Sequence, residues 1–90
     1  MFEWDAVKER TNITKHGLDF RTAAKVFLDP FHLEFEDHRE YGESRWNVIG
    51  MVEGRILFVT YTERSERIRI SSARGAEPYE RRKYNDSLYA

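Results

Sequence analysis

Apolar residues recur at the spacing of an α-helix over residues 20–28, and only weakly over residues 6–16, where the caps indicate the helix. Asp5 and Asp19 stand where helix N-caps are expected, because a carboxylate accepts hydrogen bonds from the backbone N–H groups of a first turn. Gly17 is expected to end the first helix, over residues 6–16, in the left-handed conformation that glycine adopts without strain. A second helix is predicted over residues 20–28, with an apolar stripe on one face. That stripe consists of Phe20, Ala23, Ala24 and Phe27.

After Pro30 the pattern changes to the alternation of apolar and polar residues that is typical of β-strands with one solvated face. The strand over residues 55–62 is the most apolar, so we expect it at the centre of a sheet with both faces covered. Glu53-Gly54 before it predicts a hairpin turn, and Pro78 suits the first turn of a final helix. The strands are predicted over residues 31–36, 45–52, 55–62 and 67–71, with a turn at 63–66 and a connector at 72–76.

A short extended segment at residues 2–4 precedes the helices, so the predicted order is β-α-α-β-β-β-β-α. Short hairpin connections make the later strands an antiparallel meander. Helices and strands are segregated along the chain, which predicts an α+β fold with the helices on one face of the sheet. Ninety residues are enough for one domain, residues 1–90, and too few for two.

Composition narrows the class of protein. With 40% apolar and 34% charged residues the chain is expected to be soluble and globular. It has no cysteine, which excludes disulfides and thiolate metal sites. No apolar run reaches the roughly 18 residues of a membrane span, and the first residues lack the basic and apolar regions of a signal peptide. We therefore expect a cytoplasmic protein with no membrane partner.

Charge is unevenly distributed along the chain. The net charge of −1 argues against a protein that coats nucleic acid non-specifically. Residues 1–54 hold 7 basic and 11 acidic side chains, a balance of −4, whereas residues 55–90 hold 8 and 5, a balance of +3. This asymmetry suits a compact site for a polyanion or a docking face for a charged partner, and ordinary surface charge is the alternative.

The stretch from residue 61 to residue 74 contains four arginines, and guanidinium groups bind phosphate through paired hydrogen bonds. Arg67 and Arg69 alternate with isoleucines, which predicts the solvated face of a strand and no special role. Arg64, in the predicted turn, is a catalytic candidate for stabilising a phosphate; pairing with neighbouring glutamates is the alternative. Arg74, just before the last helix, is a second catalytic candidate, because helix N-termini also favour anions; an ion pair that anchors the connector is its alternative.

Other ionisable residues are candidates for proton transfer or substrate binding. Lys15 and His16 lie at a predicted helix end, where they serve either catalysis or the helix dipole. Glu63 and Glu43 are candidate carboxylate bases, with simple solvation as the alternative for both. Arg45 and Glu43 are also candidates for substrate contact near the loop before the second strand, with cross-strand pairing as the alternative for Arg45.

The remaining signals concern RNA bases and metals. Tyr79 can stack on a base, since aromatic side chains bind the unpaired bases of single-stranded RNA. Neither His32 nor His38 has the spacing of a metal site, and we expect neither a metal ion nor another cofactor.

Three sequence blocks, in this order, resemble those of BrnT-type toxins. They are Lys-His-Gly at 15–17, Tyr-Thr-x-Arg at 61–64 and Ile-Ser-x-Ala-Arg at 70–74. One departure is Ser71, which stands where the family often has an apolar strand residue. Further matching positions are Phe2, Glu3, Trp4, Asp5, Lys8, Asn12, Phe20, Ala24, Val26, Phe27, Asp29, Pro30, Arg45, Gly50, Ala76, Glu80, Arg81 and Tyr84.

The resemblance implies a RelE-like ribonuclease fold and a type II toxin that cleaves RNA without a metal and so inhibits translation. It implies a BrnA-like ribbon-helix-helix antitoxin as partner in a hetero-oligomer, with operator DNA bound only through that complex. It also adds Arg81, in the last helix, to the candidates for substrate binding. The alternative function is a non-catalytic interaction module that acts with its partner in transcriptional autoregulation. A metal-dependent nuclease is disfavoured, because the sequence has no compact cluster of acidic and histidine ligands.

Overall fold

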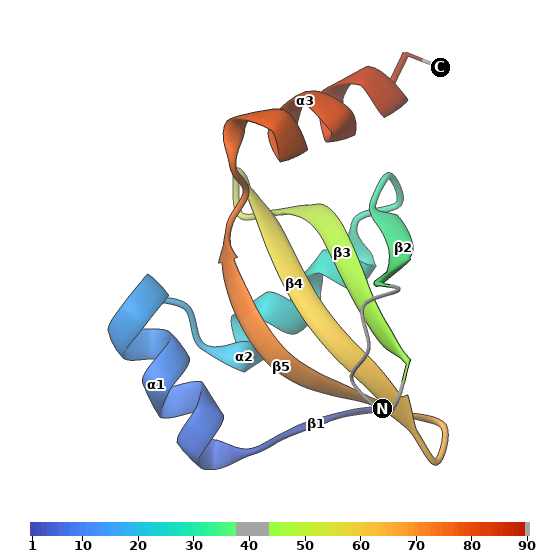
Figure 1. Cartoon of the computed structure of the whole chain (residues 1–90). Helices are drawn as coiled ribbons and strands as arrows, with labels where there is room; N and C mark the ends of the chain where they lie inside the picture. Colours follow the sequence, from blue (N-terminus) through green and yellow to red (C-terminus); the bar gives the residue numbers. More distant parts are fainter. Residues whose placement is uncertain (38–43, 90) are drawn as a thin grey trace.

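The computed structural model describes residues 1–37 and 44–89 (Figure 1). The predicted order of elements and the α+β class are confirmed. Among the described residues, no helix is long and apolar enough to cross a membrane. The elements are β1 (Phe2–Trp4), α1 (Ala6–His16), α2 (Phe20–Ala23), the 3-10 helix η1 (Ala24–Leu28), β2 (Leu33–Asp37), β3 (Arg45–Val52), β4 (Arg55–Arg64), β5 (Arg67–Gly75) and α3 (Pro78–Ser87).

The helix ends follow the predicted caps. The Asp5 carboxylate accepts from the backbone N–H of Val7 at 2.7 Å, and Gly17 ends α1 with φ of 70°. Asp19 caps α2, but the predicted second helix tightens into the 3-10 helix η1 after four residues. Here the chain passes close to β3: a Cβ at Gly50 would lie 3.1 Å from the carbonyl oxygen of Val26. Only glycine permits this approach without displacement.

The five strands form one sheet in the order β1-β5-β4-β3-β2. The predicted antiparallel meander of β2 to β5 and the central position of β4 are confirmed. Strand β1 is not part of this meander. It lies before the helices in the chain and pairs in parallel with β5. The predicted turn at 63–66 and connector at 72–76 are wrong: β4 and β5 are longer, and a two-residue turn at Ser65-Glu66 joins them. Both turn residues have positive φ, as the favoured hairpin turns require.

Helices cover both faces of the sheet rather than the predicted single face. Phe20 and Val26, from α2 and η1, pack on one face against a fully buried core that includes Val59. Helix α3 lies at one end of the sheet (Figure 1), and Lys83 covers the ring of Phe35 on the opposite face. The sequence does not show which face of the sheet α3 covers, because each strand presents its side chains to the two faces in alternation.

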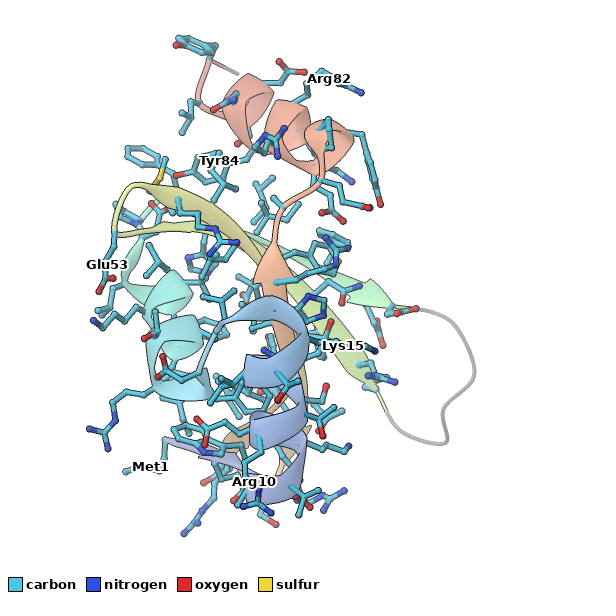
Figure 2. The ribbon with its side chains drawn as sticks, turned by 90° about the vertical axis from the view of Figure 1, so that its left-hand side faces the viewer. Met1, Arg10, Lys15, Glu53, Arg82 and Tyr84 are labelled. Atoms are coloured by element: carbon cyan, nitrogen blue, oxygen red, sulfur yellow. The ribbon has the colours of Figure 1, made fainter. Side chains whose placement is uncertain are left out.

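Tyr84 fixes α3 to the sheet. Figure 2 shows it between α3 and the strands, and its hydroxyl donates to Asp29 at 2.5 Å. Burial, and the hydrogen bond to the Asp29 carboxylate, raise the pKa of Tyr84 to about 12. Asp29 also accepts from the backbone N–H of Met51 at 2.8 Å. One carboxylate therefore joins the end of η1, the β3–β4 hairpin and α3.

Asn12 attaches α1 to the edge of β5 beyond the short strand β1. Its amide Nδ2 donates to the carbonyl oxygens of Ala73 (2.8 Å) and Leu18 (2.9 Å), and its Oδ1 accepts from the Ala73 N–H at 3.0 Å. The side chain is buried, so it replaces a missing neighbouring strand for both backbone groups of Ala73.

Replacing Asn12 with alanine is expected to lower the free energy of unfolding by about 2–4 kcal/mol, because it leaves buried backbone groups unsatisfied. Urea denaturation followed by circular dichroism measures the change. Thr14→Ala, an exposed change in the same helix, is the control and is expected to stay within about 0.5 kcal/mol of the wild type. An Asn12→Ala variant as stable as that control would contradict this role.

Candidate functional site

A pocket of about 200 Å³ opens between α1 and the end of the sheet that carries the β4–β5 turn. All ionisable side chains in its lining, among the residues that the structure describes, are cationic. We call it the basic pocket. It is lined by Lys8, Arg45, Thr62, Arg64, Arg69, Ile70 and Ser71.

Strand register builds this pocket. Thr62 of β4 pairs with Arg45 of β3 on one side and with Arg69 of β5 on the other, so the three residues form a row across the sheet. Arg64 follows Thr62 by two residues and therefore projects from the same face. It is the last residue of β4, paired with Arg67, rather than a turn residue as predicted. Three strands thus bring together arginines that are far apart in the sequence.

Ser71 lies at an irregularity in β5. Thr60 pairs with Ser72 and Tyr61 with Ile70, which leaves Ser71 as the extra residue of a β-bulge. Its Oγ donates to the carbonyl oxygen of Thr60 at 3.3 Å and lies 3.4 Å from the donating Nη2 of Arg45. Because a bulge changes the direction of the strand, it turns a polar side chain into the pocket.

Arg69 is positioned by Glu3 of β1. Its guanidinium donates to the Glu3 carboxylate at 3.0 Å, and this bond holds the pKa of Glu3 below its ordinary value. Alternation along the strand predicted no special role for Arg69, yet the structure places it in the basic pocket. Lys8 is a second lining residue that we did not single out for chemistry. Its seven-residue spacing from Lys15 on α1 is the sequence signal for a shared helix face.

A second pocket, of about 270 Å³, adjoins the basic pocket along α1, and we call it the helix groove. Both pockets share Lys8 and Ser71. The groove follows α1 from Val7 to His16, and Figure 2 shows Lys15 near the C-terminal end of this helix. The predicted pair Lys15 and His16 therefore lines the helix groove, whereas the predicted Arg64 and Arg45 line the basic pocket. The groove is lined by Val7, Lys8, Thr11, Asn12, Lys15, His16 and Ser71.

Arg74 lies at the other end of the sheet. Its guanidinium makes two hydrogen bonds to the carboxylate of Glu80, at 2.8 and 2.9 Å, and stacks 4.3 Å from the ring of Phe58. The hydrogen bond to Glu80 raises the pKa of Arg74. Positions 58 and 64 of β4 are six residues apart, which corresponds to about 20 Å of extended strand. Arg74 and Arg64 therefore do not meet at one phosphate, and a catalytic role for Arg74 stays a prediction.

The structure separates the other predicted residues from the basic pocket. Glu63 projects from the opposite face to Arg64, because neighbouring strand residues alternate. Tyr79 is exposed on α3, and Arg81 donates to the carbonyl oxygen of Ala76 at 2.7 Å. Glu43 lies outside the described residues.

The pocket beside Arg74 has a different lining, and we call it the α3 pocket. Its volume is about 480 Å³, and it lies between α3 and the sheet face that also carries the basic pocket. It is lined by Phe35, Glu36, Asp37, Asn47, Ile49, Phe58, Arg74, Tyr79, Glu80 and Lys83.

The basic pocket offers fixed positive charge and, in its described lining, no acidic side chain. Within residues 1–37 and 44–89, no group of three or more histidine, aspartate or glutamate side chains is placed to hold a metal ion. Several cations around one small pocket instead suit an anion such as phosphate. A family model described as the ribonuclease toxin BrnT of type II toxin–antitoxin systems matches residues 4–80. The chain belongs to this family.

BrnT membership agrees with the geometry of the site. The match includes α1 and β3 to β5, the elements that supply the basic pocket. A ribonuclease toxin acts on RNA, and a toxin–antitoxin system implies an antitoxin partner. A search of curated proteins found no match to the chain.

Proposed function

We propose that this BrnT-family chain is a metal-independent endoribonuclease and that the basic pocket holds the scissile phosphate. The observation that carries the proposal is the set of four cationic side chains around one pocket of about 200 Å³, with no carboxylate in its described lining. Fixed charge aimed at a phosphate is usually the largest single contribution to such catalysis.

The reaction that suits this site is attack of a ribose 2′-oxygen on the adjacent phosphorus. The 2′-oxygen–phosphorus bond forms and the bond to the 5′-oxygen breaks, which gives a 2′,3′-cyclic phosphate and a 5′-hydroxyl. One group removes the proton from the 2′-hydroxyl, and another protonates the leaving oxygen. A positioned acid or base accelerates such a step by about 10²–10⁴-fold.

Arg64, with Arg45 beside it, is assigned to the negative charge that builds on the phosphate oxygens. Both project from the end of a sheet, which holds their backbones rigidly. Proton transfer is assigned to His16 and Lys15 in the adjoining helix groove, since imidazole is the side chain that titrates near neutrality. Glu63 stays a predicted base, but its strand position directs it away from this pocket.

The same proposal includes the biological context. Cleavage of RNA would inhibit translation, and a BrnA-like ribbon-helix-helix antitoxin would neutralise the toxin in a hetero-oligomer. Operator DNA would be bound only through that complex. We place the protein in the cytoplasm, as a single toxin domain over residues 1–90 with a RelE-like fold.

The purified chain, without an antitoxin, is expected to cleave a defined single-stranded RNA in the presence of EDTA. Products carry a 2′,3′-cyclic phosphate, which gel electrophoresis and mass spectrometry identify. KM is expected to increase roughly five- to tenfold between 50 and 200 mM salt, as follows from about two phosphate contacts. Intact RNA with a correctly folded sample would contradict the proposal and favour the non-catalytic interaction module.

A further inference from the structure

Lys8 differs in chemistry from the other cations that line the basic pocket. The three arginines of the lining keep their protons, because a guanidinium group is always charged in proteins. An ammonium group carries a proton that it can give up. The hydroxyl groups of Thr62 and Ser71 are much weaker acids than an ammonium group. Within the described lining of this pocket, Lys8 is therefore the side chain best suited to donate a proton.

Lys8 lies where the basic pocket meets the helix groove. It lines both of them, and Ser71 of the β5 bulge is the other residue that they share. The N-terminal half of α1, which carries Lys8, lies towards the end of the sheet that has the β4–β5 turn (Figure 1). His16, at the C-terminal end of α1, lines the groove alone. A phosphate held by the arginines of the basic pocket therefore has Lys8 beside it.

The Lys8 ammonium is accessible to a substrate. The side chain is exposed, and within residues 1–37 and 44–89 no carboxylate forms an ion pair with it. Asp5, the nearest acidic residue before it in the chain, accepts instead from the backbone N–H groups of Val7 and Lys8, at 2.7 and 3.2 Å. The charge of Asp5 is thus used to cap α1, and the ammonium keeps its donors for a ligand.

The position of Lys8 on α1 also fits the geometry of the reaction. In-line attack places the attacking and leaving oxygens on opposite sides of phosphorus, so the base and the acid must lie on opposite sides as well. Lys8 and His16 are eight residues apart, which is about 12 Å along the helix axis. An RNA strand that follows α1 can place a phosphate between them. This order assigns the 2′-hydroxyl to His16 and the 5′-oxygen to Lys8.

We propose that Lys8 is a catalytic residue that protonates the leaving 5′-oxygen. As the bond from the 2′-oxygen to phosphorus forms, the bond from phosphorus to the 5′-oxygen breaks, and its electron pair stays on the 5′-oxygen. That oxygen takes a proton from the Lys8 ammonium, which becomes a neutral amine and regains a proton from water. The inference rests on the proposed RNA cleavage and adds the identity of its general acid.

An RNA with sulfur in place of the 5′-oxygen at the cleaved linkage tests this role, because a thiolate leaves without being protonated. Lys8→Ala is expected to lower the rate constant of single-turnover cleavage about 10²–10³-fold on ordinary RNA, the contribution of a positioned acid. On the sulfur substrate the same variant is expected to lose only a few-fold. Arg64→Ala removes charge from the phosphate and is expected to lose as much on one substrate as on the other.

Two further variants separate proton transfer from charge. Lys8→Arg keeps the positive charge but cannot give up its proton, so it is expected to lose nearly as much activity on ordinary RNA as Lys8→Ala. Arg10→Ala removes a positive charge from an exposed position of the same helix, outside the described lining of both pockets, and is expected to behave as the wild type. Circular dichroism confirms that each variant is folded.

The outcomes distinguish the role of Lys8 from the proposed function itself. If Lys8→Ala loses equally on the two substrates, or if Lys8→Arg keeps wild-type activity, Lys8 only holds the phosphate. The general acid is then wrong and the proposed function stands. If the correctly folded wild type cleaves neither substrate, the proposed function fails and the role of Lys8 fails with it.

Discussion

Replacing Arg64 with alanine is expected to lower kcat/KM for RNA cleavage by about 10²–10³-fold, the usual cost of removing one fixed donor from a charged transition state. The reason is the position of Arg64 at the end of the central strand, within a pocket whose described ionisable lining is wholly cationic. Single-turnover cleavage of a labelled RNA in EDTA measures the change. Because alanine removes no buried apolar contact there, the free energy of unfolding is expected to change little.

Arg67→Ala is the matched control for Arg64→Ala. Arg67 pairs with Arg64 across the same hairpin, and the two changes remove the same charge from the protein. It is absent from the lining of the basic pocket, and its side chain is 59% exposed beside Glu3. Its activity is expected to stay within a few-fold of the wild type. Equal losses in the two variants would mean that only the net charge of this end of the sheet matters, and would remove Arg64 from the site.

Replacing Glu80 with alanine is expected to lower the free energy of unfolding by about 2–4 kcal/mol, since it leaves the partly buried guanidinium of Arg74 without its carboxylate. The same change removes the acceptor for the backbone N–H of Glu77 and so the capping box of α3. This is a large fraction of the 5–15 kcal/mol that stabilises a typical domain. Urea denaturation measures it. Arg82→Ala, on the exposed side of α3, is the control and is expected to be nearly neutral.

The Glu80 pair also predicts a dependence of stability on pH. Burial acts to raise the pKa of Glu80, but the hydrogen bonds from Arg74 and from the Glu77 N–H outweigh it and hold the pKa below 4.5. A carboxyl whose pKa is lowered on folding stabilises the protein fully above its unfolded pKa. That part of the stability is lost as pH falls below 4.5 through the lower folded value. Glu80→Gln is expected to flatten this part of the pH profile; an unchanged profile would show that other carboxyls cause it.

Much of the fold was readable from the sequence, because local rules act within a few residues. Asp5, Gly17 and Pro78 set helix ends through their own backbone and side-chain chemistry. The two-residue turn after β3 and the apolar run of β4 likewise fixed a hairpin and a central strand. The family resemblance was confirmed by the match to residues 4–80, since it depended on blocks of sequence rather than on contacts.

Sequence alone thus determined the order of elements, the family and the residue types available for chemistry. Tertiary structure alone decided which of them meet. Cross-strand register joins Arg45, Thr62 and Arg69, which no spacing along the chain predicts. The contacts of Asn12 with Ala73 hold α1 against β5, so that Lys8 joins this row together with Ser71 of the bulge. The bonds of Arg74 to Glu80 of α3 hold Arg74 at the other end of the sheet. The physical reason is that register and helix placement depend on packing between distant segments, whereas caps, turns and strands depend on neighbours.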